Sequence, residues 1–191
     1  MSTSAFALQY AGARVLRTAA RAVHRDEFGK LAPLLGAMEK LITCEKAQGL
    51  CAPQLGAGLR LFMLAADREE DVSQVVAINP QILRRSRARS LGWEACLSVP
   101  NHGALVSRPR RISVSYETLD GESVREEEMT GDRARAFQHE MDHLDGVLYT
   151  ARMIPNSLTH TSVLRDVRER NRIAYETREE ESERLRAAHD V

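Results

Sequence analysis

The stretch from Gln138 to Gly146 constrains the fold more than any other part of the sequence. It reads Gln-His-Glu-Met-Asp-His-Leu-Asp-Gly, with His139 and His143 four residues apart. On an α-helix this spacing places both imidazoles on one face, where they can bind the same metal ion. Glu140 lies beside the first histidine and can reach a water molecule bound to that ion. The alternative interpretation is a charged helix whose histidines face solvent.

Length and charge limit the classes of protein that fit. The chain has 191 residues, enough for one domain with a hydrophobic core of its own. It carries 27 basic and 27 acidic side chains, so no net charge favours nucleic acid or an anionic membrane as the main partner. No apolar run approaches the roughly 20 residues of a membrane-spanning helix. Three cysteines, an odd number, argue against a secreted disulfide framework and favour a reducing compartment.

The first half of the chain combines one helix with a glycine-rich segment. Apolar residues at helical spacing predict a helix over residues 26–44, with Asp26 placed to cap it. The segment 49–58 contains three glycines and a proline, which predicts a loop whose backbone can approach a ligand closely. Apolar runs at 59–65 and 75–78 predict buried strands.

Further strands and the motif helix follow. The arginine-rich segment 84–89 is expected to be a solvated loop. Alternating apolar residues at 112–116 predict a half-buried strand, which Asp120-Gly121 turns into a hairpin with 122–129. Residues 131–144 are expected to form the helix of the opening motif. From residue 157 the pattern is one long helix whose charged end is expected to fray.

This order of elements predicts an α+β fold. Antiparallel β-sheets are expected to pack around the central metal-binding helix, with a helix near the N-terminus and a long helix at the C-terminus. We predict a catalytic domain over residues 1–155 and a C-terminal helical extension over 156–191. No internal repeat or second domain is apparent.

The histidine pair leaves the third metal ligand open. A catalytic site of this kind needs a third protein ligand and one position for water. The possible ligands are the acidic residues together with Cys44, Cys51, Cys96 and His102. Cys96 is the most attractive, because residues 94–100 are expected to form a loop between strands, where functional residues concentrate. A small buried cysteine without a functional role is the alternative for each thiol.

Three stretches together resemble one family, the peptide deformylases. That family carries a loop similar to G-x-G-L-A-A-P-Q, a second loop reading E-G-C-L-S and a helix reading Q-H-E-x-D-H-L-x-G. This chain has AQGLCAPQ at 47–54, EACLS at 94–98 and QHEMDHLDG at 138–146, in the same order. The resemblance extends from about Leu8 to Ile154.

The resemblance implies a metal centre and its chemistry. Cys96, His139 and His143 would hold one divalent metal ion, with Fe²⁺ expected and Zn²⁺, Ni²⁺ or Co²⁺ able to substitute. Glu140 would act as general base and then as general acid. The implied reaction is hydrolysis of the N-formyl group from the N-terminal methionine of nascent polypeptides, which releases formate.

The resemblance also implies roles around the metal. The Gln54 side chain and the Leu97 backbone N–H would donate to the oxyanion that forms during hydrolysis. Gly49 and Leu50 would contact an extended peptide substrate in the manner of strand addition.

Glu94 and Arg108 match a family pair that ties the cysteine loop to the next strand. Departures from the family occur nearby, because Ala47 and Ala95 stand where the family has glycine. At a positive φ each extra methyl group would cost roughly 1 kcal/mol. Cys51 replaces a small alanine and adds an oxidisable thiol near the site.

The largest departure concerns the substrate pocket. Asp132 and Arg135 precede His139 by seven and four residues, so they share its helix face with Ala136. The family usually has aliphatic residues there, which line the pocket for the methionine side chain. We expect Asp132 and Arg135 to pair with each other or to stay in contact with water, and to make the pocket more polar or more open. The alternative is a helix that starts later, with Asp132 as its cap and Arg135 turned to solvent.

Alternative functions stay open at this level. One is a deformylase-like metallohydrolase with an altered substrate preference. The other is a metal-binding paralogue with weak or no deformylase activity, which would bind peptide or ribosome through arginines of its C-terminal helix (Arg165, Arg168, Arg170, Arg172). The expected partners are an N-formylated peptide and, as a candidate, the ribosome; we expect a monomer or weak dimer without stable nucleic-acid or membrane binding.

The basic N-terminus bears on the compartment. No acidic residue precedes Asp26, whereas four arginines do, which is typical of mitochondrial transit peptides. The competing interpretation is a basic first element of the fold. Residues 8–10 and 15–17 resemble the opening of the family's catalytic domain, which favours the second interpretation. We therefore expect a bacterial cytoplasmic protein, with a mitochondrion or other organelle as the alternative.

Overall fold

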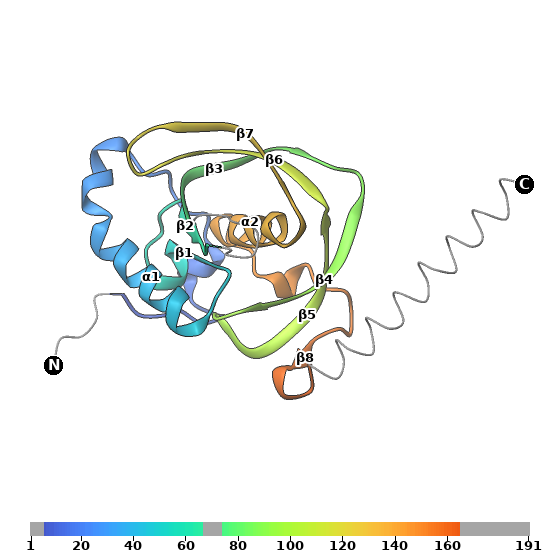
Figure 1. The fold of residues 1–191 in the computed structure, drawn as a ribbon. Helices are drawn as coiled ribbons and strands as arrows, with labels where there is room; N and C mark the ends of the chain where they lie inside the picture. The colour runs from blue at the N-terminus through green and yellow to red at the C-terminus, as the bar shows by residue number, and fades with distance from the viewer. Residues whose placement is uncertain (1–5, 67–73, 165–191) are drawn as a thin grey trace, which may run out of the picture.

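Two antiparallel β-sheets surround a central helix in this computed structural model, which describes residues 6–66 and 74–164 (Figure 1). One sheet has five strands, in the order β1 (Gly49–Cys51), β2 (Leu61–Leu64), β3 (Val75–Arg85), β6 (Arg111–Glu117) and β7 (Ser123–Thr130). The other contains β4 (Arg89–Cys96), β5 (Val99–Pro109) and β8 (Thr159–His160). This confirms the predicted α+β class with antiparallel sheets.

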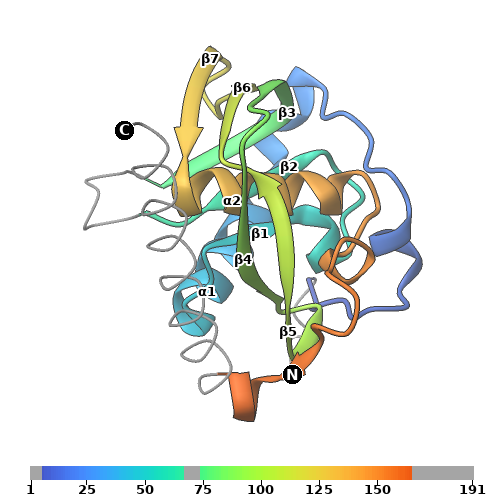
Figure 2. The same cartoon turned by 90° about the vertical axis from the view of Figure 1, so that its right-hand side faces the viewer.

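The central helix, α2, runs from Gly131 to Leu144, as predicted. Figures 1 and 2 show it between the two sheets, with the β4–β5 hairpin passing over one side. Its apolar side packs on the five-stranded sheet, where the rings of Phe137 and Phe62 meet edge to face with centroids 4.9 Å apart. Its polar side is buried too, and it carries Glu140 and His143. Burial on both sides explains why the polar groups of α2 need protein or metal partners.

The N-terminal helix begins later than the sequence indicated. The α-helix α1 runs from Ala32 to Glu45, and a separate 3₁₀ helix covers Arg25–Lys30. Pro33 has no backbone N–H, so it fits only the first turn of a helix and sets the start of α1 near itself. Asp26 therefore lies in the 3₁₀ helix and does not cap α1, as it was predicted to do.

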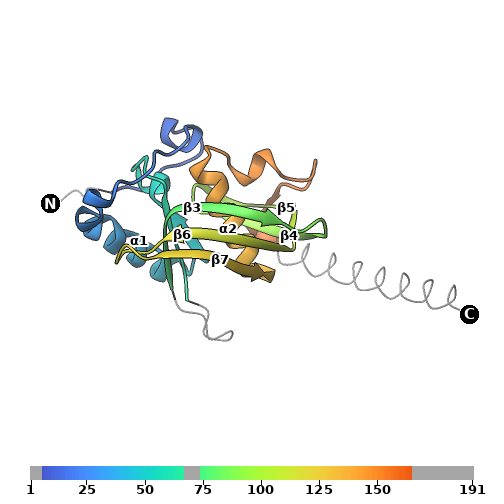
Figure 3. The same ribbon diagram turned by 90° about the horizontal axis from the view of Figure 1, so that it is seen from above.

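Two segments expected to be loops are strands only in part, since residues 52–58 and 86–88 lie outside the strands. The residues Gly49–Cys51 form β1, paired antiparallel with β2. The predicted loop at 84–89 instead continues β3 to Arg85 and opens β4 at Arg89. Figure 3 shows β3, β6 and β7 lying side by side above α2. A strand of three residues is too short to reveal an alternating pattern, and arginine runs are compatible with exposed strand ends.

The basic N-terminal segment is part of the fold. Leu16 is fully buried, and the Arg21 side chain pairs with Glu27 at 2.7 Å. The Arg21 backbone also donates to the Gly58 carbonyl at 3.0 Å. Within the described residues, no helix has the length and apolar character that crossing a membrane requires.

The predicted long C-terminal helix is described only at its start. Thr159–His160 form β8, which pairs with β5, and residues 161–164 are helical. The helix therefore does not begin at residue 157. The remainder, including the four arginines considered for ribosome binding, lies outside the described residues.

The end of α2 supplies a first prediction. Gly146 follows the helix with φ +74°, and a Cβ there would lie 2.9 Å from the backbone carbon of Arg17. Gly146→Ala is expected to lower the free energy of unfolding by about 1–2 kcal/mol or more, since left-handed strain and a backbone clash add. Urea denaturation measures the change.

Gly36 is the matched control. It lies exposed inside α1, and a Cβ there meets nothing within 4 Å. Gly36→Ala is expected to stabilise the protein by about 0.5–1 kcal/mol, because alanine is the better helix former. Equal effects of the two substitutions would contradict the packing described for Gly146.

Candidate metal centre

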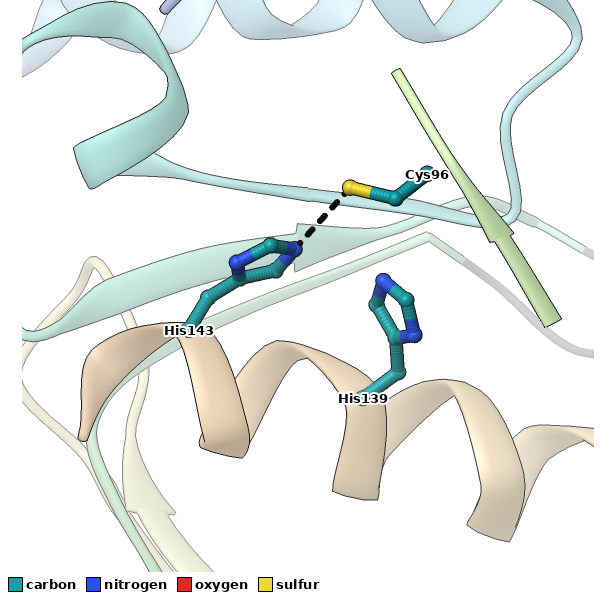
Figure 4. Close-up of side chains that lie close together, drawn as sticks. All are labelled: Cys96, His139 and His143. Carbon is teal, nitrogen blue, oxygen red and sulfur yellow. Dashed lines mark hydrogen bonds between the residues drawn. The ribbon is translucent and has the colours of Figure 1, made fainter. Parts of the chain in front are cut away.

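Three side chains from two parts of the fold converge at one point (Figure 4). Cys96 ends β4 at the turn into β5, while His139 and His143 lie on successive turns of α2. Their ligand atoms all lie within 4.8 Å of one another, and Cys96 Sγ is 3.2 Å from His143 Nε2. The predicted ligand set is therefore brought together.

The donors suit a divalent transition metal. One thiolate and two imidazole nitrogens form a mixed set that Fe²⁺, Zn²⁺, Co²⁺ and Ni²⁺ all accept. His139 Nδ1 lies 2.9 Å from Glu94 Oε2, so the hydrogen bond to this carboxylate leaves Nε2 free for a metal. Burial lowers the pKa of His143 and keeps this ring in the neutral form that coordinates metals.

Glu140 is a buried carboxyl group beside this set. Its Oε2 atom has no hydrogen-bond partner among the described residues. Burial raises its pKa to about 7, so it can take up and release a proton near neutral pH. A Cβ at Gly49 would lie 2.8 Å from Glu140 Oε1, which means that the carboxyl group packs directly against the β1 backbone.

Glu94 accepts hydrogen bonds on every side. Its Oε1 atom accepts from Arg108 Nε at 2.6 Å and from Arg135 Nη1 at 2.8 Å. Its Oε2 atom accepts from Arg108 Nη2 at 2.8 Å and from His139 Nδ1 at 2.9 Å. Burial alone would raise the Glu94 pKa, but the hydrogen bonds from Arg108 and His139 outweigh burial and hold that pKa at about 2. Glu94 is therefore ionised when it contacts His139.

The ionic network continues along α2. Arg108 is buried and also donates from Nη1 to Asp142 Oδ2 at 2.9 Å. The same Asp142 oxygen accepts from Arg152 Nε at 2.7 Å. The predicted Glu94–Arg108 pair is thus part of a longer chain of charges that fixes the helix against β4 and β5.

Gln54 lies beside the cysteine ligand. Its Oε1 accepts from the Cys51 backbone N–H at 3.0 Å, which orients the amide. Its Nε2 then donates toward Cys96 Sγ at 3.4 Å and Ser98 Oγ at 3.2 Å. Leu97 occupies the turn between these two residues, next to the metal ligand.

The other possible third ligands are less suitable. Cys44 is exposed and distant in the fold from this cluster, and His102 Nδ1 contacts the Pro100 carbonyl at 2.9 Å. Cys51 Sγ does lie within 4.8 Å of donor atoms of Glu140 and His143. Burial raises the pKa of Cys51, so its thiol stays protonated and is a poor ligand.

Of the two expectations for Asp132 and Arg135, pairing with each other is wrong, and contact with water holds for Asp132 alone. No ion pair joins them in the described part of the chain; Arg135 is held by Glu94, and Asp132 is exposed. The alternative of a later helix start is wrong as well, because α2 begins at Gly131 with Thr130 as its N-cap. Asp132 and Ala136 line a small cavity, whereas the Arg135 guanidinium turns toward β4.

The alanines that replace family glycines cause no strain. Among the described residues, positive φ angles outside glycine occur only at four other positions (Lys46, Asn79, Asn101, Asn156). Ala47 and Ala95 are not among them. The methyl group of Ala95 is thus compatible with the turn that carries Cys96.

Sequence reasoning missed part of the network. Arg135 reaches Glu94 across 41 residues of sequence, and Arg152 joins Asp142 from the segment after α2. Only one local signal existed: Arg135 and His139 are four residues apart and share a helix face, so both can contact the same group.

Comparisons with known proteins agree with this geometry. A family model described as polypeptide deformylase matches residues 6–158. The peptide deformylase of Synechocystis sp. is 39% identical over 153 residues, which cover 76% of this chain and 78% of that protein. Peptide deformylase 2 of Gloeobacter violaceus is 40% identical over 152 residues, 77% of this chain and 78% of that protein.

Solved structures show the same fold. The peptide deformylase of Thermotoga maritima is 35% identical with a TM-score of 0.72, covering 78% of this chain and 98% of that one. A class I type b peptide deformylase from Acinetobacter baumannii, solved with Met-Ala-Ser bound, is 33% identical with the same TM-score of 0.72 and the same coverage, 78% and 98%. The sequence comparisons and the structure comparisons therefore find similarity to the same class of protein.

Proposed function

The chain belongs to the polypeptide deformylase family, and we propose that it hydrolyses the N-formyl group from the N-terminal methionine of nascent polypeptides. The products are formate and a peptide with a free amine. The observation that carries this function is the Cys96, His139 and His143 cluster with Glu140 buried beside it. Within this reaction the roles of individual residues follow from their contacts.

Glu140 moves the proton. Cys96, His139 and His143 would hold a divalent ion, which would supply the Lewis acidity for activating a water molecule near neutral pH. Glu140 accepts the proton of this water through its unpartnered Oε2 atom and passes it to the peptide nitrogen as the C–N bond breaks. A pKa of about 7 suits both halves of this transfer.

Gln54 and Leu97 stabilise the negative oxygen that develops on the formyl group. The contact of Gln54 Nε2 with Cys96 Sγ at 3.4 Å places the amide donor beside the metal ligands. Because Oε1 is occupied by the Cys51 N–H, the amide cannot present its oxygen instead. The backbone N–H of Leu97 is the second donor, from the turn that carries Cys96.

The β1 strand receives the peptide. It is an edge strand of the five-stranded sheet, and Gly49 contacts the Glu140 carboxyl group. Gly49 and Leu50 offer backbone groups to an extended substrate, as in strand addition. Asp132 and Ala136 lie at the cavity beyond and border the first side chain of the substrate.

We assign Fe²⁺ as the native metal, with Zn²⁺, Ni²⁺ and Co²⁺ as functional substitutes. The mixed thiolate and imidazole donors are compatible with all four ions, and the resemblance of the motifs to the family favours iron among them. Metal analysis of protein purified without oxygen tests it, and activity after reconstitution with each ion ranks them. A protein that purifies with zinc and loses activity with iron would contradict the assignment.

A polar cavity supports a second, narrower proposal on substrate choice. Asp132, Arg133 and Gln48 all line this cavity, where a wholly aliphatic surface would favour methionine. We propose that formyl peptides beginning with glutamine, whose amide can both donate and accept hydrogen bonds, are hydrolysed better, relative to methionine, than by a deformylase with aliphatic residues there. Asp132→Leu should restore the preference for methionine. A variant with unchanged relative kcat/KM for the two peptides would exclude Asp132 as a determinant.

The relatives named above and the folded N-terminal segment support the bacterial cytoplasm as the compartment. We also propose that the protein acts as a monomer on chains that emerge from the ribosome. Sedimentation at assay concentration and co-pelleting with ribosomes test these two points.

Formate release from formyl-Met-Ala-Ser is the direct test of the function. Wild-type protein with one metal per chain should release formate, and removal of the metal by a chelator should abolish the release. Restoring the metal should restore it. Metal-loaded protein that releases no formate would refute deformylation of peptides.

Gly49→Ala provides a prediction on the position of Glu140. The new methyl group would lie 2.8 Å from Glu140 Oε1 and 3.0 Å from Leu64 Cδ2, so the carboxyl group must move. We expect kcat to fall at least about tenfold, because general acid–base catalysis depends on placement. Gly58→Ala, where a Cβ meets nothing within 4 Å, should retain activity. Similar rates in both variants would contradict this role of Gly49.

A further inference from the structure

Both terminal nitrogens of the Arg135 guanidinium donate hydrogen bonds to other residues of the protein. Its Nη1 atom donates to Glu94 Oε1 at 2.8 Å and to the Val106 carbonyl at 3.0 Å. Its Nη2 atom donates to the Ser90 carbonyl at 2.9 Å and to Ser90 Oγ at 3.1 Å. The side chain is only 12% exposed. These contacts fix the guanidinium between α2 and the strands β4 and β5, and they use all four N–H donors of its two terminal nitrogens.

Gly92 makes the room for this arrangement. A Cβ on Gly92 would lie 2.7 Å from Arg135 Cζ and 2.8 Å from both Nε and Nη2. The guanidinium therefore packs flat against the β4 backbone at a residue without a side chain. Arg135 and Gly92 form a complementary pair, in which one residue supplies the cation and the other supplies the space.

The packing of Arg135 on Gly92 allows Arg135 to hold the Glu94 carboxylate in place. A carboxylate offers about four acceptor positions, and Glu94 uses them for two bonds from Arg108, one from Arg135 and one from His139. With Oε1 held by two arginines, the carboxylate cannot rotate, and Oε2 stays directed at His139. A carboxylate that contacts a metal-bound histidine fixes the orientation of the ring and tunes its basicity.

We propose that Arg135 is a positioning residue, which holds Glu94 and through it orients the His139 ring toward the metal. This inference rests on the proposed function, because it assigns His139 to the metal. It replaces the expectation that Arg135 contacts the substrate. Arg135 acts on metal retention and on the chemical step, whereas the substrate's side chain is bordered by other residues.

The test compares two substitutions of Arg135 in metal-loaded protein. Arg135→Met keeps most of the apolar stem but removes the cation, while Arg135→Lys keeps a charge that can reach Glu94. We expect Arg135→Met to lose metal to a chelator about 10–100 times faster than wild type, with Arg135→Lys between the two. The absorption bands of the Co²⁺-substituted protein should shift in Arg135→Met, because the His139 ring is released. kcat should fall while KM for formyl-Met-Ala-Ser changes less than twofold.

Gly92→Ala tests the same contact without altering any charge. Its methyl group should push the guanidinium away from Glu94 and so accelerate metal loss in the presence of Arg135. In the Arg135→Met background the same substitution should add little, since the clash is gone. Such non-additivity measures the coupling between the two residues. Thermal unfolding of each variant, with Gly36→Ala as a control, confirms that folded protein is compared.

Two results would overturn the proposal. One is wild-type metal retention and an unchanged Co²⁺ spectrum in Arg135→Met. The other is a variant whose KM or preference for the first side chain changes while kcat and metal retention do not, since this would make Arg135 a substrate residue. Failure of the proposed function is distinct: wild-type protein would then release no formate, but metal loss would still report on Arg135.

Discussion

Replacing Glu140 by glutamine is expected to lower kcat for formate release by about 10²–10⁴-fold while the protein keeps its metal. Glutamine has nearly the same shape but cannot accept a proton from water. The side chain is buried and its Oε2 atom has no hydrogen-bond partner among the described residues, so this oxygen is available to accept a proton. The three metal ligands are untouched. Stopped or continuous assays of formate release give kcat, and metal analysis gives the metal content per chain.

The matched control is Glu39→Gln. Glu39 is exposed on α1, far from the metal site in the fold, and its substitution should leave kcat and metal content unchanged. If Glu140→Gln retained more than a tenth of the wild-type kcat, the proton would have to pass through another group. If it lost the metal, Glu140 would instead help to hold the ion.

Arg108→Met is expected to lower the free energy of unfolding by about 3–5 kcal/mol. Arg108 is 4% exposed and is bonded to Glu94 and Asp142, so its removal leaves buried carboxylates with fewer partners. The Glu94 pKa should rise because a principal hydrogen-bond donor is gone, and the His139 ring should be held less firmly. Chemical denaturation of metal-loaded protein measures the loss of stability.

Arg111→Met is the comparison for this change. Its pairing with Glu128 is long, at 3.8 Å, and both side chains are more than 60% exposed, at 67% and 63%. Such a surface pair contributes less than about 1 kcal/mol. If Arg108→Met lowered the free energy of unfolding by less than about 1 kcal/mol, the buried network could rearrange or admit water. Burial would then not make this ion-pair network important for stability.

Most of the metal site could be predicted because its residues lie close together in the sequence. His139, Glu140 and His143 occupy one helix, and the bounds of that helix agree with the apolar pattern. Cys96 followed from the resemblance of its loop to a family motif. The β6–β7 hairpin was likewise predicted from alternation and the turn at Asp120-Gly121.

The remaining features depend on contacts that the sequence pattern does not carry. The expectation for Arg135 failed because the nearest acid in sequence, Asp132, was taken as its partner. The actual partner, Glu94, lies on the strand β4 and becomes available only when β4 packs on α2. Similarly, β1 became visible only through its pairing with β2, because three residues give no periodicity.

In the proposed binding mode, the shortness of β1 limits how many residues of a polypeptide the enzyme contacts through backbone hydrogen bonds. Three residues span about 10 Å at roughly 3.3 Å per residue, so a bound chain can exchange backbone bonds with β1 over only its first few residues. Residues further downstream lie beyond this edge and contribute little to affinity. Main-chain groups are the same in every polypeptide. Recognition through them over so short a span would let one enzyme act on polypeptides of almost any sequence. Because β1 is short, it also offers other chains little unpaired strand edge on which to aggregate by β-pairing.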